Sequence, residues 1–252
     1  TLATYSYELN NKKAPFDNVN VRKALNLSLD RNVITDKVLG QGQTPTYVFT
    51  PTYIEEGHLI QQPAYSKEPM AQRNEEAIKL LEEAGYSKAN PLKFTILYNT
   101  NENHKKVAIA AASMWKANTK GLIDVKLENQ EWKTYIDSRR AGRYDAARAG
   151  WNADYNQATT FGNYFLSNSS NNTAKYANPE YDKAIAESYV ATDAEGRAKA
   201  YAKAEEILAK DFGIVPIFNY VNPRLVKPYV KGYSGKDPQD HIYLRNLYII
   251  KH

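Results

Sequence analysis

The chain has 252 residues, of which 42% are hydrophobic and 24% charged, and it carries a net charge of +5. This composition predicts one large globular domain or two small ones, and no apolar run approaches the ~18 residues that cross a bilayer. The absence of cysteine excludes disulfides and thiolate metal sites. The chain begins Thr-Leu-Ala, without an initiator Met or a secretory segment, so we expect a processed or cut chain.

The first forty residues predict one strand followed by two helices. Apolar and polar residues alternate in part of the segment 1–13, which favours a strand. Asp17 or Asn18 is expected to cap the first helix, and Asp30 the second, which should stop near Gly40. The chain therefore opens with a strand and a pair of helices.

A proline-rich stretch separates this region from the next helix. Residues 44–69 show little periodicity, so we expect an ordered loop there. Asn74 is predicted to cap a helix over residues 75–84 that ends at Gly85.

Strands and helices alternate in the middle of the chain. The predicted elements, in order, are strand 92–98, helix 105–117, strand 123–127, helix 132–141 and strand 144–149. These helices are long enough for right-handed crossovers, so the pattern predicts an α/β unit. Ligands of open α/β sheets gather beyond the carboxyl ends of strands, and we expect residues 150–155 just past the third strand.

The last third predicts two more helices and two extended segments. The helices are expected over 179–190 and 194–210. An extended segment should follow over 212–221, and a last strand over 243–250. The closing portion is too sparse in helices to form a domain alone.

The stretch after the third strand carries the chemistry that points most clearly to a function. A guanidinium at Arg148 and a carboxylate at Asp154 flank the small residue Gly150, with Trp151 and Tyr155 between them. Such a set can hold a zwitterion, and every free peptide has an ammonium and a carboxylate at its ends. At Gly150 a side chain could obstruct a peptide strand, although a simple bulge also explains a glycine. We therefore interpret this stretch as a peptide-binding site.

Other interpretations of the same residues stay open. Arg148 could be a structural ion-pair partner of Asp145 or Asp154, and His104 a capping or surface residue. Asp145 with Asp154 could form a glycosidase-like carboxylate pair. A short basic cluster from Arg139 to Arg143, with aromatic residues, could bind nucleic acid, although it is short for that purpose.

The sequence contains none of the usual enzyme signatures. Nucleophile elbows, phosphate loops and paired-histidine zinc motifs are absent. Four histidines are spread too far apart for a local metal pattern: His58, His104, His241 and His252. We therefore expect no enzyme activity, no metal and no cofactor.

Taken together, several stretches resemble the C-terminal half of an oligopeptide-binding protein, the extracytoplasmic solute receptor of a peptide ABC importer. The stretches that carry the resemblance are 10–16, 21–25, 73–77, 84–86, 97–100, 104–106, 129–133, 147–151, 153–156 and 225–228. Each is weak alone, but their order and spacing cover nearly the whole chain. The resemblance is nearest to the Gram-negative oligopeptide binders.

The resemblance implies a receptor about twice as long, with two lobes that close on a peptide like a hinged trap. The fold class would be an α/β, periplasmic-binding-protein-like lobe with a mixed sheet flanked by helices. Residues 1–9 would belong to the hinge and first lobe, residues 10–215 would form the second ligand-binding lobe, and residues 216–252 would return to the hinge and first lobe. The N-terminal half of the receptor would be missing.

The resemblance also implies the function and the partners. The receptor would be periplasmic, would bind extended peptides of roughly two to five residues, and would deliver them to an ABC permease in the inner membrane. Nucleic acid is not an expected partner. A related receptor for murein peptide, haem or another solute is the alternative within the family.

Site residues follow from the resemblance position by position. Asp154 matches an aspartate that pairs with the peptide ammonium, and Gly150 and Asn152 match positions that bond the peptide main chain. Arg148 and His104 match basic residues that meet the peptide carboxylate. Asn152 departs from the pattern, because close relatives carry cysteine there.

Further positions would surround the peptide side chains. Trp132 and Arg139 resemble walls of side-chain pockets, and Tyr220 resembles a tyrosine that faces the ligand on the returning strand. Trp151 is expected to line the same site. Both tryptophans could instead be core residues.

Overall fold

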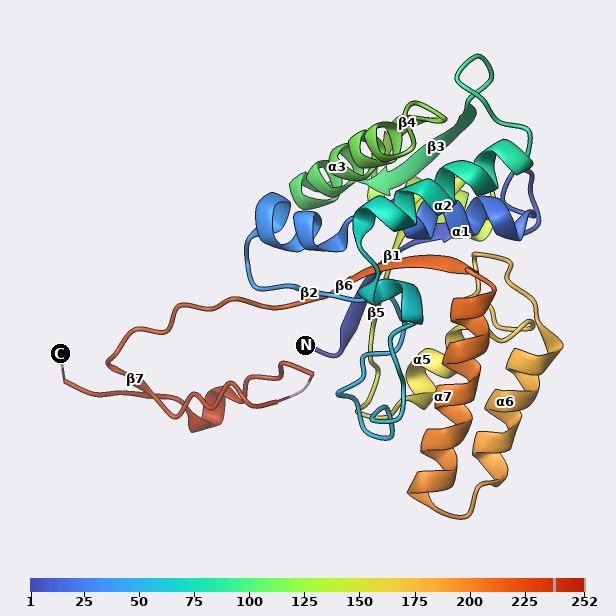
Figure 1. Cartoon of the computed structure of the whole chain (residues 1–252). Coiled ribbons are helices and arrows are strands. Elements are labelled where there is room, and N and C mark those ends of the chain that lie inside the picture. The colour runs from blue at the N-terminus through green and yellow to red at the C-terminus, as the bar shows by residue number, and fades with distance from the viewer. Residues whose placement is uncertain (238, 252) are drawn as a thin grey trace.

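The computed structural model describes residues 1–237 and 239–251, and it is built on a mixed β-sheet (Figure 1). The strands are β1 Ala3–Leu9, β2 Thr44–Pro45, β3 Leu92–Asn99, β4 Ile123–Gln130, β5 Ala146–Asn152, β6 Ile214–Asn219, β7 Val230–Lys231 and β8 Tyr248–Ile249. Six of them form one sheet in the order β2-β6-β1-β5-β3-β4, and β7 and β8 form a small ribbon. The α/β fold with a mixed sheet is confirmed.

Helices cover both faces of the large sheet. The α-helices are α1 Val19–Leu27, α2 Met70–Glu83, α3 Glu102–Asn118, α4 Trp132–Arg140, α5 Thr159–Gly162, α6 Pro179–Val190 and α7 Ala194–Lys210. A π-helix (η1) spans Val33–Leu39, and short 3-10 helices span Ala64–Lys67 (η2), Asn163–Phe165 (η3) and Leu244–Asn246 (η4). Among the helices described, none is long and apolar enough to cross a membrane.

The strand pairing places the N-terminal strand, β1, inside the sheet. β3 pairs in parallel with β4 and β5, while β1 lies antiparallel between β5 and β6. Every residue of β1 is buried. The hinge and lobe boundaries remain a prediction, but residues 1–9 and 216–219 share this sheet with the α/β unit.

Two large hydrophobic clusters lie on opposite faces of the sheet. One packs α1, α2 and α3 against residues such as Tyr5, and the other packs α5, α6 and α7 around Phe161 and Tyr164. Figure 1 shows these two groups of helices as an upper and a lower part. Since neighbouring residues of a strand face opposite sides, Arg148 and Gly150 face the α3 side and Trp151 the α5 side.

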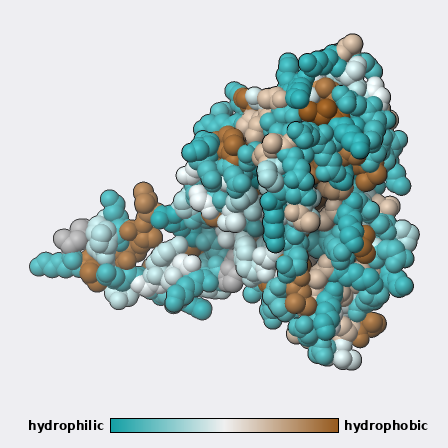
Figure 2. Space-filling model, viewed as in Figure 1, coloured by the Kyte–Doolittle hydropathy of each residue, from teal (hydrophilic) through white to brown (hydrophobic). Residues whose placement is uncertain are grey.

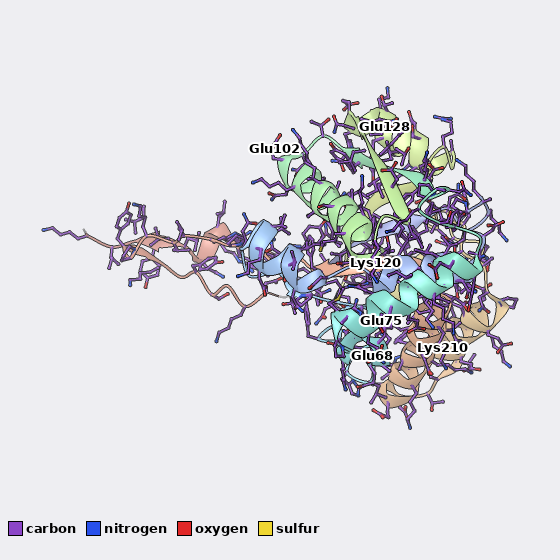
Figure 3. All side chains as sticks on the ribbon, turned by 45° about the horizontal axis from the view of Figure 1, so that its top comes forward. Glu68, Glu75, Glu102, Lys120, Glu128 and Lys210 are labelled. Atoms are coloured by element: carbon purple, nitrogen blue, oxygen red, sulfur yellow. The ribbon has the colours of Figure 1, made fainter. Side chains whose placement is uncertain are left out.

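Helix caps agree with several of the predictions from sequence. Asn18 caps α1 through the amide of Asn20, and Asp30 accepts hydrogen bonds from the amides of the turn that leads into η1. The left-handed Gly40 ends η1. At α3, Glu102 lies in the first turn and Lys120 lies just beyond the last residue (Figure 3), which suits the helix dipole.

Several predictions of element boundaries were wrong. Asn74 is inside α2, which begins at Met70 after Pro69, because buried Arg73 bonds the carbonyl groups of Asn26 and Leu29 at the end of α1 and holds that first turn. β5 continues to Asn152, because β1 pairs alongside it to the end. Of the predicted last strand, residues 243–250, only the two residues of β8 are in a strand.

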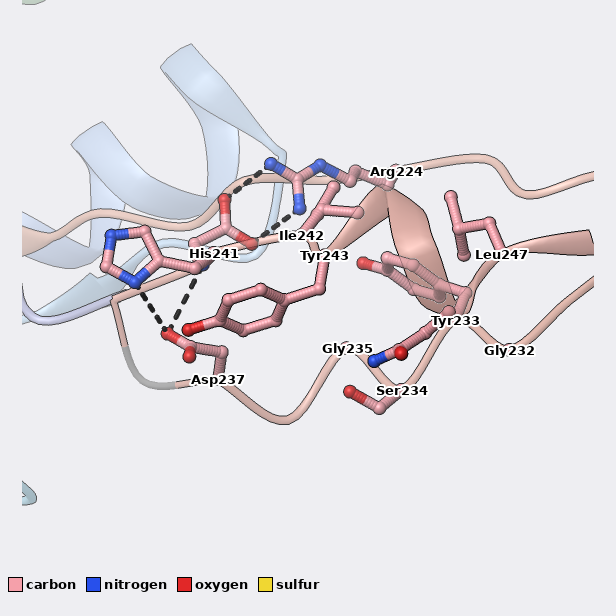
Figure 4. Close-up of a pocket in the computed structure, with 12 residues that line it drawn as sticks. Arg224, Gly232, Tyr233, Ser234, Gly235, Asp237, His241, Ile242, Tyr243 and Leu247 are labelled. Atoms are coloured by element: carbon pink, nitrogen blue, oxygen red, sulfur yellow. Dashed lines mark hydrogen bonds and ion pairs between the residues drawn. The ribbon is translucent and has the colours of Figure 1, made fainter.

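The C-terminal arm, which we define as residues 221–237 and 239–251, projects from the body (Figures 1 and 2). Arg224 donates two hydrogen bonds of 2.6 Å to the Asp240 carboxylate, which braces the arm (Figure 4). The arm exposes an unusual number of apolar side chains: Leu225, Val226, Ile242, Tyr243, Leu244, Tyr248, Ile249 and Ile250. Such a surface is typical of an interface.

Candidate functional site

The carboxyl ends of the three parallel strands gather most of the predicted site residues at one edge of the sheet. His104 lies in the first turn of α3, after β3. Trp132 begins α4, directly after β4. Gly150 and Asn152 are in the last three residues of β5, and Asp154 lies in the loop that follows the strand. This is the edge at which open α/β sheets bind ligands.

Arg148 lies at the centre of an aromatic cluster. Its guanidinium donates a hydrogen bond to the hydroxyl of Tyr220 and lies 5.2 Å from the centre of the Tyr5 ring. The Tyr5 ring lies 5.5 Å from the His104 ring and 5.9 Å from the Tyr220 ring. The hydroxyl of Tyr135 donates to the Arg148 carbonyl group. The structure therefore brings Arg148, His104 and Tyr220 together.

A hollow of about 310 Å³ opens beside this cluster. Its lining includes Tyr5, His104 and Tyr220, together with residues of the η1–β2 loop and the start of the C-terminal arm. Within the part of the chain that is described, the buried Nδ1 of His104 and Nε of Arg148 have no hydrogen-bond partner. Unpaired buried polar groups cost free energy, which favours a polar partner for them. Of the two residues only His104 lines the hollow, whereas Arg148 reaches it through the hydrogen bond to Tyr220.

The two basic side chains differ in charge. Burial works against the charge of Arg148, but Tyr220, Tyr5 and Tyr135 raise the pKa of its guanidinium above the usual value. Burial lowers the pKa of His104 to about 3, and the positive charge of Arg148 contributes to this shift. At neutral pH, Arg148 can therefore pair with an anion as a cation, while His104 can only form a hydrogen bond.

The His104 imidazole should stay neutral in this chain between about pH 5 and pH 8, where an ordinary histidine titrates. In the unfolded chain His104 binds a proton near its ordinary pKa, whereas in the folded chain its pKa is about 3. The free energy of unfolding therefore decreases as the pH falls from the ordinary pKa toward about 3. NMR of the imidazole resonances, assigned with His104→Gln, measures the titration. A midpoint above about pH 5 would contradict the burial described here.

Gly150 stands where β5 passes closest to the tyrosine cluster. It pairs with Tyr5 of β1. A Cβ atom at this position would lie 2.9 Å from the Tyr220 hydroxyl and 3.1 Å from Nη2 of Arg148. A side chain would therefore push apart the two groups that bond each other, which explains the glycine better than a bulge does.

Asp154 lies in an exposed loop, where Gln239 of the C-terminal arm donates to its carbonyl group at 2.9 Å and one threonine bonds its amide and its carboxylate. Its amide donates to Oγ1 of Thr160 at 3.2 Å, and that hydroxyl donates to Oδ2 of Asp154 at 3.4 Å. Trp151 donates its indole N–H to the same hydroxyl at 3.2 Å and packs its ring 4.9 Å from Tyr164. Trp151 is thus half-buried against the core, while the Asp154 carboxylate faces outward.

Three other predicted site residues belong neither to the Arg148 cluster nor to the Asp154 cluster. Asn152 is exposed at the end of β5. Trp132 is 54% exposed, and its ring lies 5.9 Å from that of Tyr135. Arg139 is buried, and its guanidinium bonds the Glu8 carboxylate at 2.9 Å. The roles of these three residues in binding stay predictions.

The structure argues against the two other classes of function. Asp145 bonds Lys13 at 2.6 Å and precedes β5, whereas Asp154 follows it, so more than roughly 20 Å of extended strand separates them. Glycosidase carboxylates lie within roughly 10 Å of each other. In the basic cluster from Arg139 to Arg143, Arg139 is committed to Glu8, which leaves two exposed arginines, Arg140 and Arg143. Asp145 and Asp154 therefore do not form a glycosidase-like pair, and two arginines alone make a small basic surface. His252, the last of the histidines considered as metal ligands, lies outside the described residues.

Sequence reasoning missed three residues that shape the site. Tyr5 faces His104 and Arg148, Tyr135 bonds the Arg148 carbonyl group, and Thr160 holds Asp154. The alternation around Tyr5 indicated a strand but not which strands would flank it. Thr160 lies six residues after Asp154. A hydroxyl residue after a short loop is too common in protein sequences to indicate a contact with the aspartate.

Comparison with known proteins places this geometry in a family. The sequence pattern described as "Bacterial extracellular solute-binding proteins, family 5 Middle" matches residues 1–173, which is more than half of the chain. The chain belongs to this family. The match includes Asp154, Thr160 and the whole of β5.

Relatives in the solute-binding family align with the chain from end to end. It is 97% identical to the periplasmic oligopeptide-binding protein OppA of Haemophilus influenzae and 55% identical to OppA of Salmonella typhimurium, over 100% of this chain but only 47% and 46% of those proteins. The chain therefore spans about half the length of the curated relatives it matches. The expectation of a missing half is confirmed.

Solved structures agree with the fold. The chain superposes on a Haemophilus influenzae OppA structure, in complex with RPPGFSPFR, with a TM-score of 0.94, covering 100% of this chain and 49% of that one at 96% identity. It superposes on the Escherichia coli murein tripeptide binding protein MppA with a TM-score of 0.91 at 44% identity, covering 100% of this chain and 49% of that one. The periplasmic-binding-protein-like fold is thus confirmed.

Proposed function

We propose that this chain is the second ligand-binding lobe of a periplasmic receptor that binds peptides in extended form and delivers them to an ABC permease. The observation that carries the proposal is the pair of opposite charges along β5: buried Arg148 beside a hollow, and exposed Asp154 beyond the strand end. The peptide carboxylate would meet Arg148, and the peptide ammonium would meet Asp154. The absence of a side chain at Gly150 lets Arg148 and Tyr220 lie close to β5, and the peptide main chain would run between the two charges.

The relatives support peptides over other solutes. The Haemophilus influenzae relative at 97% identity is named for oligopeptides, whereas the relatives named for murein peptide and for haem are 45% and 31% identical. The peptide in the solved complex, RPPGFSPFR, is longer than the two to five residues expected from sequence. We therefore propose that the accepted lengths extend to such peptides.

The C-terminal arm is proposed to pack on the missing N-terminal half. Its exposed apolar side chains, Leu225 and Ile249 among them, give that half a surface to cover. A ligand would then be enclosed between two lobes, and the lobe alone should bind weakly. No catalytic role is proposed.

Binding of free and N-acetylated forms of one peptide to the full-length receptor tests the function. Acetylation removes the ammonium charge and leaves the rest of the peptide intact. We expect saturable binding of the free peptide, without turnover, and at least tenfold weaker binding of the acetylated one, measured by isothermal titration calorimetry. Equal affinities would refute the charge pairing at Asp154.

A further inference from the structure

We infer that Thr160 is the positioning residue that orients the Asp154 carboxylate for the ammonium of a peptide. The inference rests on the proposed function. Thr160 lies in α5, only 4% of its surface is exposed, and it touches both Trp151 and Asp154. The threonine acts through the acid and would not itself touch the peptide.

The Thr160 hydroxyl uses all of its hydrogen-bonding capacity on these two residues. A hydroxyl group has one proton to donate and two lone pairs that accept. Both lone pairs are taken, by the indole N–H of Trp151 at 3.2 Å and by the amide of Asp154 at 3.2 Å. The proton is therefore left to point at Oδ2 of Asp154, 3.4 Å away.

This arrangement selects one orientation of an exposed carboxylate. Oδ2 receives the threonine proton, and among residues 1–237 and 239–251 no group donates a hydrogen bond to Oδ1. An exposed aspartate would otherwise sample several rotamers and would lose that freedom when a ligand binds. Holding the group in advance lowers the ordering cost, which is how a supporting residue raises affinity.

The loop between Asp154 and Thr160 is fixed from its other side. The side-chain Nε2 of Gln157 and the guanidinium of Arg197 both donate to the buried carboxylate of Glu56, at 2.9 Å and 2.7 Å. The amide of Ala158 bonds the carbonyl group of Glu55 at 3.0 Å. Because the loop backbone is anchored independently, removing the Thr160 hydroxyl should release the carboxylate without unfolding the loop.

Thr160→Val removes the hydroxyl and keeps the shape of the side chain, while Thr160→Ser keeps the hydroxyl. The matched control is Thr119→Val, at a threonine that is also buried and whose hydroxyl donates to the carbonyl group of Trp115 at the far end of α3. Each variant of the full-length receptor is titrated with the free and the N-acetylated form of one peptide. The ratio of the two dissociation constants reports on the ammonium contact alone, and the midpoint of thermal unfolding reports on stability.

We expect Thr160→Val to reduce the preference for the free peptide about fivefold to tenfold, with little change for the acetylated peptide. Thr160→Ser and Thr119→Val should keep the preference of the unmodified receptor. A Thr160→Val receptor that keeps the full preference would overturn the inference and leave the proposed function intact. A Thr160→Ser receptor that loses the preference would also overturn it, even if the valine variant fails to fold. No preference in the unmodified receptor would refute the proposed function itself.

Discussion

Replacing Asp154 with alanine in the full-length receptor should weaken the binding of free peptides by roughly 10-fold to 100-fold. A charge-assisted hydrogen bond contributes about 1.5–3 kcal/mol, and every 1.4 kcal/mol changes affinity about tenfold. The carboxylate is exposed at the carboxyl edge of the sheet, with Oδ2 already bonded to Thr160. Calorimetric titration of one peptide against both receptors measures the loss.

Asp137→Ala is the matched control for that variant. Asp137 is an exposed acid in α4, so its removal changes the net charge equally without touching the loop of Asp154. The control should bind peptides with unchanged affinity. If the Asp154 variant also kept its affinity, Asp154 would be removed from the site.

Replacing Arg139 with methionine should be strongly destabilising, by about 3–5 kcal/mol. The Arg139 guanidinium bonds the fully buried carboxylate of Glu8 at 2.9 Å, and Tyr164 and Thr173 also bond that carboxylate. Without Arg139, Glu8 in the central strand keeps a buried negative charge and loses its partner. Differential scanning calorimetry of the full-length receptor should show a clearly lower midpoint of unfolding.

Two further variants compare the stability contributed by the buried Arg139–Glu8 ion pair with that of an exposed ion pair. Combining Arg139→Met with Glu8→Gln removes the unpaired charge and should recover part of the loss. Lys203→Met breaks the exposed pair of Lys203 with Glu187 and should cost no more than about 1 kcal/mol. If Arg139→Met were as mild as Lys203→Met, then the Glu8 pair would have little structural importance and Arg139 would be available as a pocket wall.

Most elements could be predicted from local pattern, because each depends on residues close in sequence. The helices Pro179–Val190 and Ala194–Lys210 begin after the caps Asn178 and Asp193, and their bounds match the predictions. The strand and helix alternation from Leu92 onward was also predicted, although the ends moved. One such end moved where a tertiary contact extends the element, as pairing with β1 does for β5.

The parts of the site that could be predicted are those in which one stretch of sequence carries the chemistry. Arg148, Gly150, Trp151 and Asp154 are neighbours along β5 and its loop, so their types and spacing alone indicated a site for two opposite charges. Arg139 shows the limit of this reasoning. Its surroundings come from Glu8, 131 positions earlier in the chain, and no local pattern reveals that pairing.

The sequence by itself determined the succession of strands and helices, the family, and the charged groups near the end of β5, because these depend on residue types and short spacings. Only the tertiary structure decided which groups meet. Tyr5, His104, Arg148 and Tyr220 come from four separate segments, and they lie together because β1 inserts between β5 and β6. Burial of that cluster then sets the charge of each group, since desolvation makes His104 neutral while the tyrosines keep Arg148 charged.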